Sequence, residues 1–384
     1  MTNANDAARP VRLVVAGGGT GGHVLPAIAV LDDLRDRGLL GEALWIGSHS
    51  GLERETARAA GISFRAIQTG KLRRYPSLET TTDALRIPVG IVQARRALTV
   101  FRPDVVFSTG GFVSVPTAIA AKGIAPLLTH EQTAILGLAT RINARFADVL
   151  AISWAAALPE ARKIHRHAIA TGNPVRAALA RGNAARGLAR WGFSPDLPLL
   201  YVTGGARGAS PINTRLAALL PDLLEHTQVL HQTGPESANT DRADLLARRA
   251  TWPEHLQRRY QAIEFLRDEL PDAYAAGDLV VGRAGAGIVA ELAFLGKPAV
   301  LIPLPGAGSD EQTRNARLLA DAGGAVLLPQ HEATPETLRA VILELLDDPA
   351  RRQRMADAAR GVGQPDAARR LADALLDLAN TPRR

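Results

Sequence analysis

The stretch VRLVVAGGGTGGHVLPAIAVLDDLRD runs from Val11 to Asp36 and joins an apolar strand, a glycine-rich turn and a stretch of helical period. A second stretch, LLYVTGGARGASPINTRLAALLPDLLEH, has the same order of parts and runs from Leu199 to His226. A strand, a glycine-rich turn and a helix in this order are typical of the opening unit of a parallel α/β domain. The repetition predicts two similar domains in one chain.

Short runs rich in Val, Ile and Leu recur along the whole chain, with stretches of helical period between them. Apolar runs of this kind predict strands that are buried on both faces, and the helical stretches predict crossover helices. We therefore predict an α/β fold of two Rossmann-like, doubly wound parallel sheets. The predicted strands are Val11–Ala16, Ala43–Gly47, Phe64–Thr69, Val105–Thr109, Pro126–His130, Val149–Ser153, Leu199–Thr203, Gln228–Gln232, Ala262–Leu266, Leu279–Gly282, Pro298–Leu304 and Ala325–Leu328. The clearest predicted helices are Leu25–Arg37, Gly51–Ala60, Ile212–His226 and Gly287–Leu295.

The boundary between the domains is predicted at the segment GNPVRAALARGN, where Pro174 interrupts regular structure and several arginines favour contact with water. The predicted parts are a flexible N-terminus at 1–10, a first domain at 11–172, a linker at 173–186, a second domain at 187–364, and a closing helix and tail at 365–384.

Composition excludes several classes of protein. The 384 residues include no cysteine, which excludes a disulfide scaffold, a cysteine nucleophile and thiolate metal sites. The net charge of +7 is spread along the chain, so we expect no nucleic-acid partner. The polar residues 1–10 do not have the pattern of a signal peptide, and Arg283, Glu291 and Lys297 interrupt the longest apolar stretch. We therefore expect no membrane-spanning segment.

The first glycine-rich turn, Gly17–Gly22, has the spacing G-x-G-x-x-G. Such a turn lets a ligand approach the backbone, and the helix that follows offers N–H groups to an anion. A dinucleotide site also needs an acidic residue about 20 positions further on, which holds the ribose. Ser48 and His49 stand there instead, so an NAD-dependent oxidoreductase is disfavoured.

His23 follows the glycines directly, at the predicted carboxyl end of the first strand. This is the edge at which α/β proteins place ligands. An imidazole also accepts a proton near neutral pH. We interpret His23 as a candidate catalytic base rather than a surface histidine, while His130 and Glu131 remain alternative bases.

Polar and glycine-rich clusters recur at later strand ends. They are STGGFVSVP (Ser108–Pro116), THEQT (Thr129–Thr133), GNPVR (Gly172–Arg176), TGGARGA (Thr203–Ala209), GRAGAGIVAE (Gly282–Glu291) and PLPGAGSDEQTRNA (Pro303–Ala316). One such cluster indicates a turn, but six on the strand edges of two domains indicate a cleft that both domains line.

Together these motifs resemble the MurG family, the bacterial glycosyltransferases of family 28 that transfer N-acetylglucosamine from UDP-N-acetylglucosamine to lipid I, giving lipid II, in peptidoglycan synthesis. The resemblance rests on GGTGGH (Gly18–His23), GGFVSVP, HEQT, GNPVR, AGAGIVAE and DEQTRNA, and it extends from about Val11 to the closing helix. It implies the two-domain GT-B fold, with the acceptor bound by the N-terminal domain and the donor mainly by the C-terminal one. It also implies an inverting transfer without a metal or other cofactor, and the chain has no D-x-D pair to hold a metal.

The resemblance assigns roles to individual residues. His23 corresponds to the catalytic histidine. Residues implied on the donor side are Thr20, Gly21, Gly22, Thr133, Arg176, Ala206, Leu266, Ala286, Gly287, Ile288, Val289, Glu291, Glu311 and Gln312. Residues implied on the acceptor side are Gly110, Gly111, Phe112, His130 and Glu131. Among these, Glu291 corresponds to the residue that holds the ribose diol, and Glu311 with Gln312 to the pair that binds the sugar hydroxyls. The family often has Asn at the position of Thr133, Ser at that of Ala206, and Gln or His at that of Glu311.

Other functions stay open at this point. A related GT-B transferase with another lipid or small-molecule acceptor would differ between Gly70 and Ile91, where acceptor choice is expected. A sugar-nucleotide epimerase would need several acids in the cleft, and Glu131, Glu291, Asp310 and Glu311 are the candidates. A non-catalytic nucleotide-binding module would need Glu291 but not His23.

A membrane contact is the last expectation. The segment GKLRRYPS, from Gly70, is basic, and Leu85, Ile87, Val89, Ile91 and Val92 follow it among Arg86, Arg95 and Arg96. An apolar patch bordered by arginines is typical of a peripheral anchor to an anionic membrane surface, although a buried helix gives the same pattern. The resemblance places such a protein on the cytoplasmic face of the bacterial cell membrane.

Overall fold

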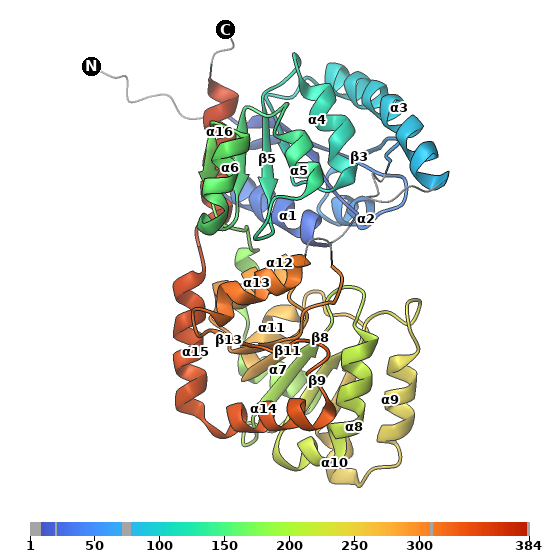
Figure 1. The fold of residues 1–384 in the computed structure, drawn as a ribbon, viewed down its shortest axis with the longest axis vertical. Helices are drawn as coiled ribbons and strands as arrows, with labels where there is room; N and C mark the ends of the chain where they lie inside the picture. Colours follow the sequence, from blue (N-terminus) through green and yellow to red (C-terminus); the bar gives the residue numbers. More distant parts are fainter. Residues whose placement is uncertain (1–8, 20, 71–77, 308–309, 382–384) are drawn as a thin grey trace, which may run out of the picture. The chain divides into compact units, whose positions relative to one another are not determined.

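The computed structural model describes residues 9–19, 21–70, 78–307 and 310–381, without the side chains of 78–85. The chain divides into two compact units (Figure 1). Unit 1 consists of Met1–Arg176 together with Pro365–Arg384, and unit 2 consists of Ala177–Gln364. Each unit has its own parallel sheet and its own hydrophobic core.

Unit 1 contains a seven-stranded parallel sheet in the order β3-β2-β1-β4-β5-β6-β7. Its strands are β1 (Val11–Ala16), β2 (Leu40–Gly47), β3 (Ser63–Ala66), β4 (Val105–Ser108), β5 (Leu127–Glu131), β6 (Val149–Ile152) and β7 (Ala168–Ala170). The central strands β1 and β4 are almost wholly buried, which explains their continuous apolar sequences.

Helices cover both faces of this sheet. They are α1 (Gly21–Asp36), α2 (Leu52–Ala59), α3 (Leu78–Phe101), α4 (Val115–Ala121), α5 (Leu138–Asn143), α6 (Leu158–Ile164) and α16 (Ala367–Asn380), with short 3-10 helices η1 (Phe112–Ser114) and η2 (Ala155–Ala157). The C-terminal helix α16 belongs to this unit because its Leu371 and Leu375 are fully buried in the core that Leu31 and Leu34 of α1 also form (Figure 1). The chain therefore ends in the unit in which it begins.

Unit 2 contains a six-stranded parallel sheet in the order β10-β9-β8-β11-β12-β13. Its strands are β8 (Leu199–Thr203), β9 (Gln228–Gln232), β10 (Tyr260–Ile263), β11 (Leu279–Gly282), β12 (Ala299–Leu301) and β13 (Ala325–Leu327). Its helices are η3 (Ala177–Arg181), α7 (Ala184–Trp191), α8 (Ser210–His226), α9 (Asp241–Arg249), α10 (Glu254–Arg258), α11 (Leu270–Ala276), α12 (Ala286–Leu295), α13 (Glu311–Ala320), α14 (Pro335–Asp347) and α15 (Pro349–Val362).

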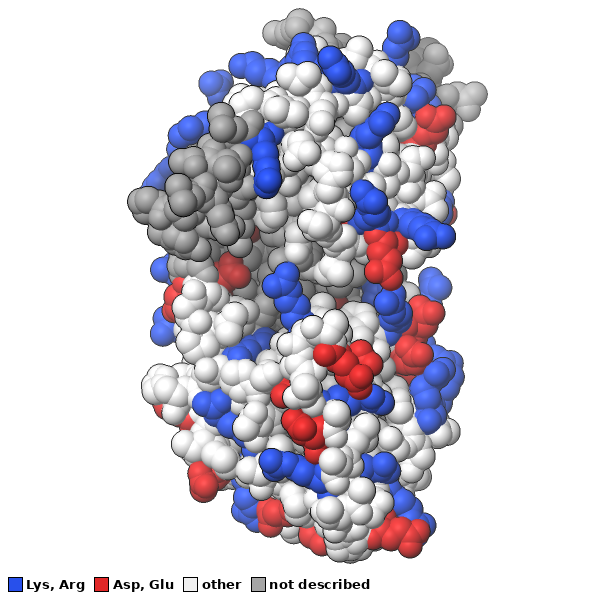
Figure 2. Space-filling view, turned by 90° about the vertical axis from the view of Figure 1, so that its right-hand side faces the viewer, with Lys and Arg blue, Asp and Glu red and all other residues white. Residues whose placement is uncertain are grey.

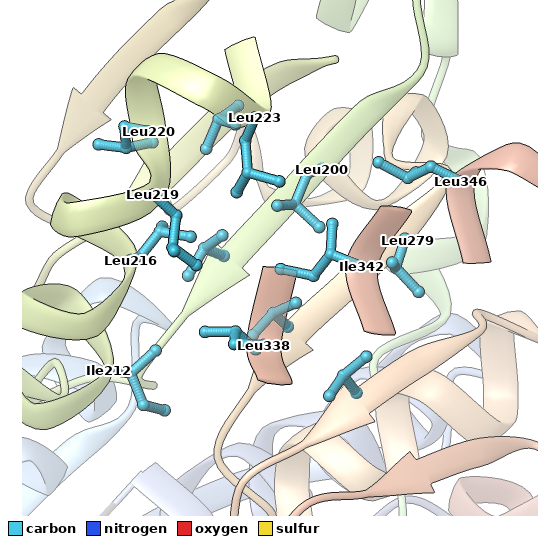
Figure 3. Packing of buried hydrophobic residues seen from close by; sticks show 14 of the residues in the cluster. Leu200, Ile212, Leu216, Leu219, Leu220, Leu223, Leu279, Leu338, Ile342 and Leu346 are labelled. Carbon is cyan, nitrogen blue, oxygen red and sulfur yellow. The ribbon is translucent and has the colours of Figure 1, made fainter. Parts of the chain in front are cut away.

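Leucine-rich helix faces fill the core of unit 2 (Figure 3). Leu216 and Leu223 of α8 and Leu338 of α14 pack around Leu200 of β8, and all four are fully buried. Burying each such side chain stabilises the fold by roughly 1.5–3 kcal/mol. The helical spacing of these leucines thus fixes α8 against the sheet.

The α/β prediction of two parallel sheets is confirmed, and β1, β8, β9 and β11 have the predicted bounds. Two details differ. The edge strand β7 was not predicted, since AIA is too short to give a pattern. The segment 173–186, expected to be an irregular linker, contains η3 and the start of α7, and Arg186 forms an ion pair with the buried Asp272 in unit 2. No helix among the described residues is long and apolar enough to span a membrane.

Candidate active site

The strand order places a switch point between β1 and β4 in unit 1, and another between β8 and β11 in unit 2. At a switch point the loops after two neighbouring strands diverge, which leaves a crevice at the carboxyl edge of the sheet. In unit 1 these are the glycine loop that begins at Gly17, before α1, and the loop that begins at Thr109. Both predicted glycine motifs of this unit therefore meet at one edge.

Glu53 holds the glycine loop in place. Its carboxylate accepts hydrogen bonds from the backbone N–H of Gly19 at 3.0 Å, from that of Ser48 at 2.9 Å, and from the Ser48 hydroxyl at 2.5 Å. The Glu53 side chain is fully buried, and a Cβ at Gly18 would lie 2.4 Å from its carboxyl carbon. The loop needs glycine there because the carboxylate occupies that space. The sequence motifs gave no signal for Glu53, which lies a few residues beyond Ser48 and His49, where a dinucleotide site would have its acidic residue.

His23 lies in the first turn of α1, where it is half-buried. Its Nδ1 is 2.9 Å from the carbonyl oxygen of Thr109 and 3.0 Å from Oε1 of Gln132. No described residue hydrogen-bonds to its other ring nitrogen, Nε2. The imidazole is therefore anchored through one nitrogen and keeps the second for a ligand.

Gly110 and Gly111 pass directly beside the His23 ring. Both have a positive φ, +81° and +73°. A Cβ at Gly111 would lie 3.0 Å from Cδ2 of His23, and a Cβ at Gly110 would lie 3.6 Å from its Cε1. Phe112 follows and faces the glycine loop, because a Cβ at Gly19 would lie 3.3 Å from its ring. The predicted acceptor-side residues 110–112 are thus brought together with His23.

His130 and Gln132 form a buried layer beneath His23. The Nε2 of Gln132 lies 2.7 Å from the Thr109 carbonyl oxygen and 3.2 Å from Nδ1 of His130. The Nε2 of His130 lies 3.0 Å from the carbonyl oxygen of Gly172. Burial lowers the pKa of His130 to about 4, which keeps the ring neutral. Both of its ring nitrogens are engaged and the side chain is fully buried, so His130 has no free nitrogen to offer a ligand.

The carboxylate of Glu131 faces its own loop. It accepts hydrogen bonds from the backbone N–H of Thr133 at 3.1 Å, the Thr133 hydroxyl at 2.8 Å and the backbone N–H of Gly137 at 2.9 Å. Glu131 is 3% exposed. The hydrogen bonds of Glu131 and Thr133 shape the turn after β5. Neither side chain hydrogen-bonds to His23. The oxygens of Glu131 are thus engaged within their own turn, whereas no described residue hydrogen-bonds to Nε2 of His23.

In unit 2, the predicted donor segment Ala286–Val289 forms the first turn of α12. The N-cap residue is Gly285, which has no side chain of its own, and a Cβ at Gly285 or Gly287 would meet nothing within 4 Å. The first N–H groups of a helix have no intrahelical partner and attract anions. The open space before this turn therefore suits a phosphate group.

Glu291 lies in the second turn of α12 and is half-buried. Its Oε2 accepts a 2.7 Å hydrogen bond from the hydroxyl of Tyr274 on α11. Tyr274 is 2% exposed, its ring packs edge-on against Tyr201, and burial raises its pKa well above the usual value. Tyr274 lies in no motif, so sequence reasoning gave no signal for it.

Gln312 ties two loops together beside α12. Its Oε1 accepts hydrogen bonds from the backbone N–H of Leu304 at 3.0 Å and of Ala284 at 3.3 Å. Because this oxygen is engaged, Gln312 offers a ligand its amide N–H groups. Glu311 precedes it as the first residue of α13. The buried guanidinium of Arg283 holds the same loop by donating to the carbonyl oxygens of Ile302 and Pro303.

Leu266 lies after β10 rather than at its end, and its backbone N–H donates to Oε1 of Gln232 at 3.2 Å. Ala206 lies in the glycine turn after β8, where a Cβ at Gly208 would lie 2.1 Å from the carbonyl oxygen of Thr233. Arg176 is the last residue of unit 1 and is half-buried. Thr20 lies outside the described residues. Among the residues described, no group of three His, Asp or Glu side chains could hold a metal ion.

Comparison with known proteins gives two family matches. Residues 13–152 match the glycosyltransferase family 28 N-terminal domain, and residues 199–371 match the glycosyltransferase family 28 C-terminal domain. The first match contains His23 and the Gly110–Phe112 loop, and the second contains Glu291.

Two curated relatives are named UDP-N-acetylglucosamine–N-acetylmuramyl-(pentapeptide) pyrophosphoryl-undecaprenol N-acetylglucosamine transferase. That of Desulfitobacterium hafniense is 35% identical over 96% of this chain and all of its own length. That of Treponema pallidum is 37% identical over 94% of both chains.

Solved structures agree on the fold. MurG of Acinetobacter baumannii superposes with a TM-score of 0.71 at 29% identity, over 96% of this chain and all of that one. UDP-GlcNAc 2-epimerase from Neisseria meningitidis has a TM-score of 0.64 at 16% identity, over 95% of this chain and 99% of that one. The second likeness shows the shared fold alone.

Proposed function

The chain belongs to glycosyltransferase family 28, and from this premise we propose that it transfers N-acetylglucosamine from UDP-N-acetylglucosamine to undecaprenyl-diphospho-N-acetylmuramoyl-pentapeptide. It is a hexosyltransferase of peptidoglycan synthesis. The observation that carries the proposal is the placement of His23, whose Nδ1 is anchored and whose Nε2 faces away from its hydrogen-bond partners, at the switch point of unit 1. A non-catalytic binding module has no need of this arrangement.

The proposed reaction is a displacement at the anomeric carbon of N-acetylglucosamine. The acceptor hydroxyl attacks this carbon while its proton passes to Nε2 of His23, and the bond to the UDP oxygen breaks. Because attack comes from the side opposite the leaving diphosphate, the configuration inverts. General-base catalysis of this kind contributes about 10²–10⁴-fold to the rate.

Unit 2 supplies the groups for the donor. The diphosphate binds at the first turn of α12, where Gly285 and Gly287 leave room for a ligand, and the positive end of the helix offsets the negative charge that develops on departing UDP. The carboxylate of Glu291 accepts hydrogen bonds from the ribose diol. Gln312 donates to a hydroxyl of the sugar through its amide, and Glu311 accepts from another.

We propose that transfer requires no metal, since the positive N-terminal end of α12 provides the stabilisation that a metal would provide. The decisive experiment is transfer from labelled UDP-N-acetylglucosamine to a soluble lipid I analogue in the presence of EDTA. We expect product at the same rate with and without EDTA. Binding of the donor without transfer would point to another acceptor, and loss of transfer with EDTA would restore a metal to the mechanism.

We also propose that unit 1 contacts an anionic membrane surface, at the cytoplasmic face of the cell membrane. Unit 1 carries 25 Lys and Arg against 16 Asp and Glu, a net charge of +9, whereas unit 2 carries 20 against 22, a net charge of −2. Figure 2 shows blue side chains predominating over unit 1 on one face. On α3, Val89 and Val92 are 49% and 52% exposed, and the neighbouring Arg95 and Arg96 are exposed. This surface suits the headgroup region that surrounds a lipid-linked acceptor.

A further inference from the structure

The side-chain amide of Gln132 has one orientation that its surroundings allow. One of its terminal atoms lies 2.7 Å from the carbonyl oxygen of Thr109, which only accepts hydrogen bonds. That atom must therefore be the nitrogen. The same nitrogen lies 3.2 Å from Nδ1 of His130, so its two protons have two acceptors. The atom 3.0 Å from His23 is then the amide oxygen.

His130 supports this orientation from below. Its Nε2 lies 3.0 Å from the carbonyl oxygen of Gly172 and therefore carries the proton. The neutral ring then presents an unprotonated Nδ1 to Gln132. The hydroxyl of Ser153 donates its proton to the carbonyl oxygen of Glu131. Its oxygen, which lies 3.2 Å from Nε2 of His130, can therefore accept a hydrogen bond, and this is consistent with a proton on that Nε2.

The two neighbours of His23 Nδ1 are thus both acceptors, the Thr109 carbonyl and the Gln132 amide oxygen. An acceptor pair requires that Nδ1 bear a proton, and in the neutral imidazole this leaves a lone pair on Nε2. We propose that Gln132 is a positioning residue that holds His23 in the Nδ1–H tautomer, so that Nε2 is the atom that receives the proton of the attacking hydroxyl. This inference rests on the proposed function for the role of Nε2, but the tautomer itself is independent of it.

The nearby carboxylates do not fix the tautomer of His23 in place of Gln132. Glu131 is turned to Thr133 and Gly137, and Glu53 is turned to Gly19 and Ser48. No carboxylate among the described residues hydrogen-bonds to His23, in contrast to the Ser-His-Asp arrangement, where an aspartate fixes the tautomer. A neutral amide fixes the tautomer and stabilises the imidazolium less than a carboxylate would, which suits a base that must release its proton after each turnover.

The test is Gln132→Met, which preserves the length of an unbranched side chain and removes its polar atoms. Spectra of protein labelled with ¹⁵N-histidine report the tautomer directly, with the His23 signals identified by their absence in His23→Ala. We expect wild type to show the Nδ1–H form alone and Gln132→Met to show a detectable share of the Nε2–H form, since only the Thr109 carbonyl remains. The turnover number should fall by roughly threefold to tenfold, the effect of one hydrogen bond, with KM for both substrates unchanged.

Gln228→Met is the matched control. Gln228 is also a buried glutamine, 2% exposed against 1% for Gln132, but it binds Ser194 and Leu197 in unit 2. This variant should match Gln132→Met in loss of stability while it leaves the His23 spectrum unchanged. An unaltered His23 tautomer in folded Gln132→Met would overturn the inference. If Gln132→Met changed the tautomer of His23 but kept full turnover, Gln132 would still be the residue that positions His23. His23 would then not be the base of the proposed mechanism.

Discussion

The hydroxyl of Tyr274 donates a 2.7 Å hydrogen bond to Oε2 of Glu291, which joins a buried ring on α11 to a half-buried carboxylate on α12. Tyr274 is fixed by its edge-on packing against Tyr201, whose ring centroid lies 5.5 Å away. A carboxylate held by a rigid phenol loses little freedom when it binds a diol. The phenol therefore prepares Glu291 for the ribose of the donor.

Tyr274→Phe should weaken UDP binding by roughly 1 kcal/mol, about fivefold, because Glu291 loses its fixed partner. Isothermal titration calorimetry with UDP measures this. Tyr260→Phe is the control, since Tyr260 is another buried tyrosine of unit 2 that pairs with His231 instead. Glu291→Ala should cost roughly 1–3 kcal/mol, and Tyr274→Phe should add nothing in that background. If the losses of UDP affinity in Tyr274→Phe and Glu291→Ala were additive in the double variant, Tyr274 would not act through Glu291.

His23→Ala should lower the turnover number by about 10²–10⁴-fold and leave UDP affinity nearly unchanged, because the proposed contact of His23 is with the acceptor hydroxyl. Steady-state transfer kinetics and UDP titration measure the two quantities separately. His49→Ala provides a comparison, since His49 is exposed after β2 of the same unit and should tolerate the change. A large loss of UDP affinity in His23→Ala would place the imidazole on the donor instead.

Periodicity and glycine spacing were sufficient to predict two parallel sheets, apart from the edge strand β7, and the two turns after β1 and β8. They could not predict Glu53, Gln132 or Tyr274, because each of these acts through a contact between segments 17 to 109 residues apart in the chain. The polar groups of Glu131 were predicted for a ligand, but they form bonds within their own turn. A motif indicates which residues gather at a strand end, while their orientation depends on packing.

Gly111→Ala should lower turnover because the added Cβ would lie 3.0 Å from both the His23 ring and the Gly18 carbonyl oxygen, at a backbone φ of +73°. The left-handed conformation costs a non-glycine residue roughly 1–2 kcal/mol. Gly123→Ala is a control for that strain, since φ there is +78° and nothing lies within 4 Å of the new methyl group.

Both variants should lose a similar free energy of unfolding in denaturant titrations, but Gly111→Ala alone should lower kcat. Equal kcat in the two variants would show that the space beside His23 is not needed for transfer.

Val89→Asp combined with Val92→Asp should abolish flotation of the protein with vesicles rich in anionic phospholipid, because two exposed apolar contacts on α3 become charges of the same sign as the membrane. Transfer to a soluble acceptor analogue should be unchanged. Ile169→Asp is the control, since Ile169 is 37% exposed on β7 of the same unit. If wild type stayed in the soluble fraction, the membrane contact would be wrong.

His130 makes the stability of unit 1 depend on pH. Burial lowers its pKa to about 4, whereas an unfolded histidine titrates near 6.5, so the unfolded chain binds more protons between these values. The contribution is fully present above pH 6.5 and is lost progressively as the pH falls toward 4. His130 alone should therefore reduce the free energy of unfolding by about 2 kcal/mol between pH 7 and pH 5.

Denaturant titrations at pH 7 and pH 5 test this with His130→Gln, whose side chain does not titrate. The variant should be less stable than wild type at pH 7, because it loses the packing of the buried ring. Between pH 7 and pH 5, however, its free energy of unfolding should decrease by about 2 kcal/mol less than that of wild type. His331→Gln serves as the comparison, because the His331 side chain is 82% exposed and should leave the pH dependence unaltered. If His130→Gln retained the full wild-type pH dependence, His130 would not be held neutral in the folded state. Its Nδ1 would then not be a dependable acceptor for Gln132, and the argument for the tautomer of His23 would lose this support.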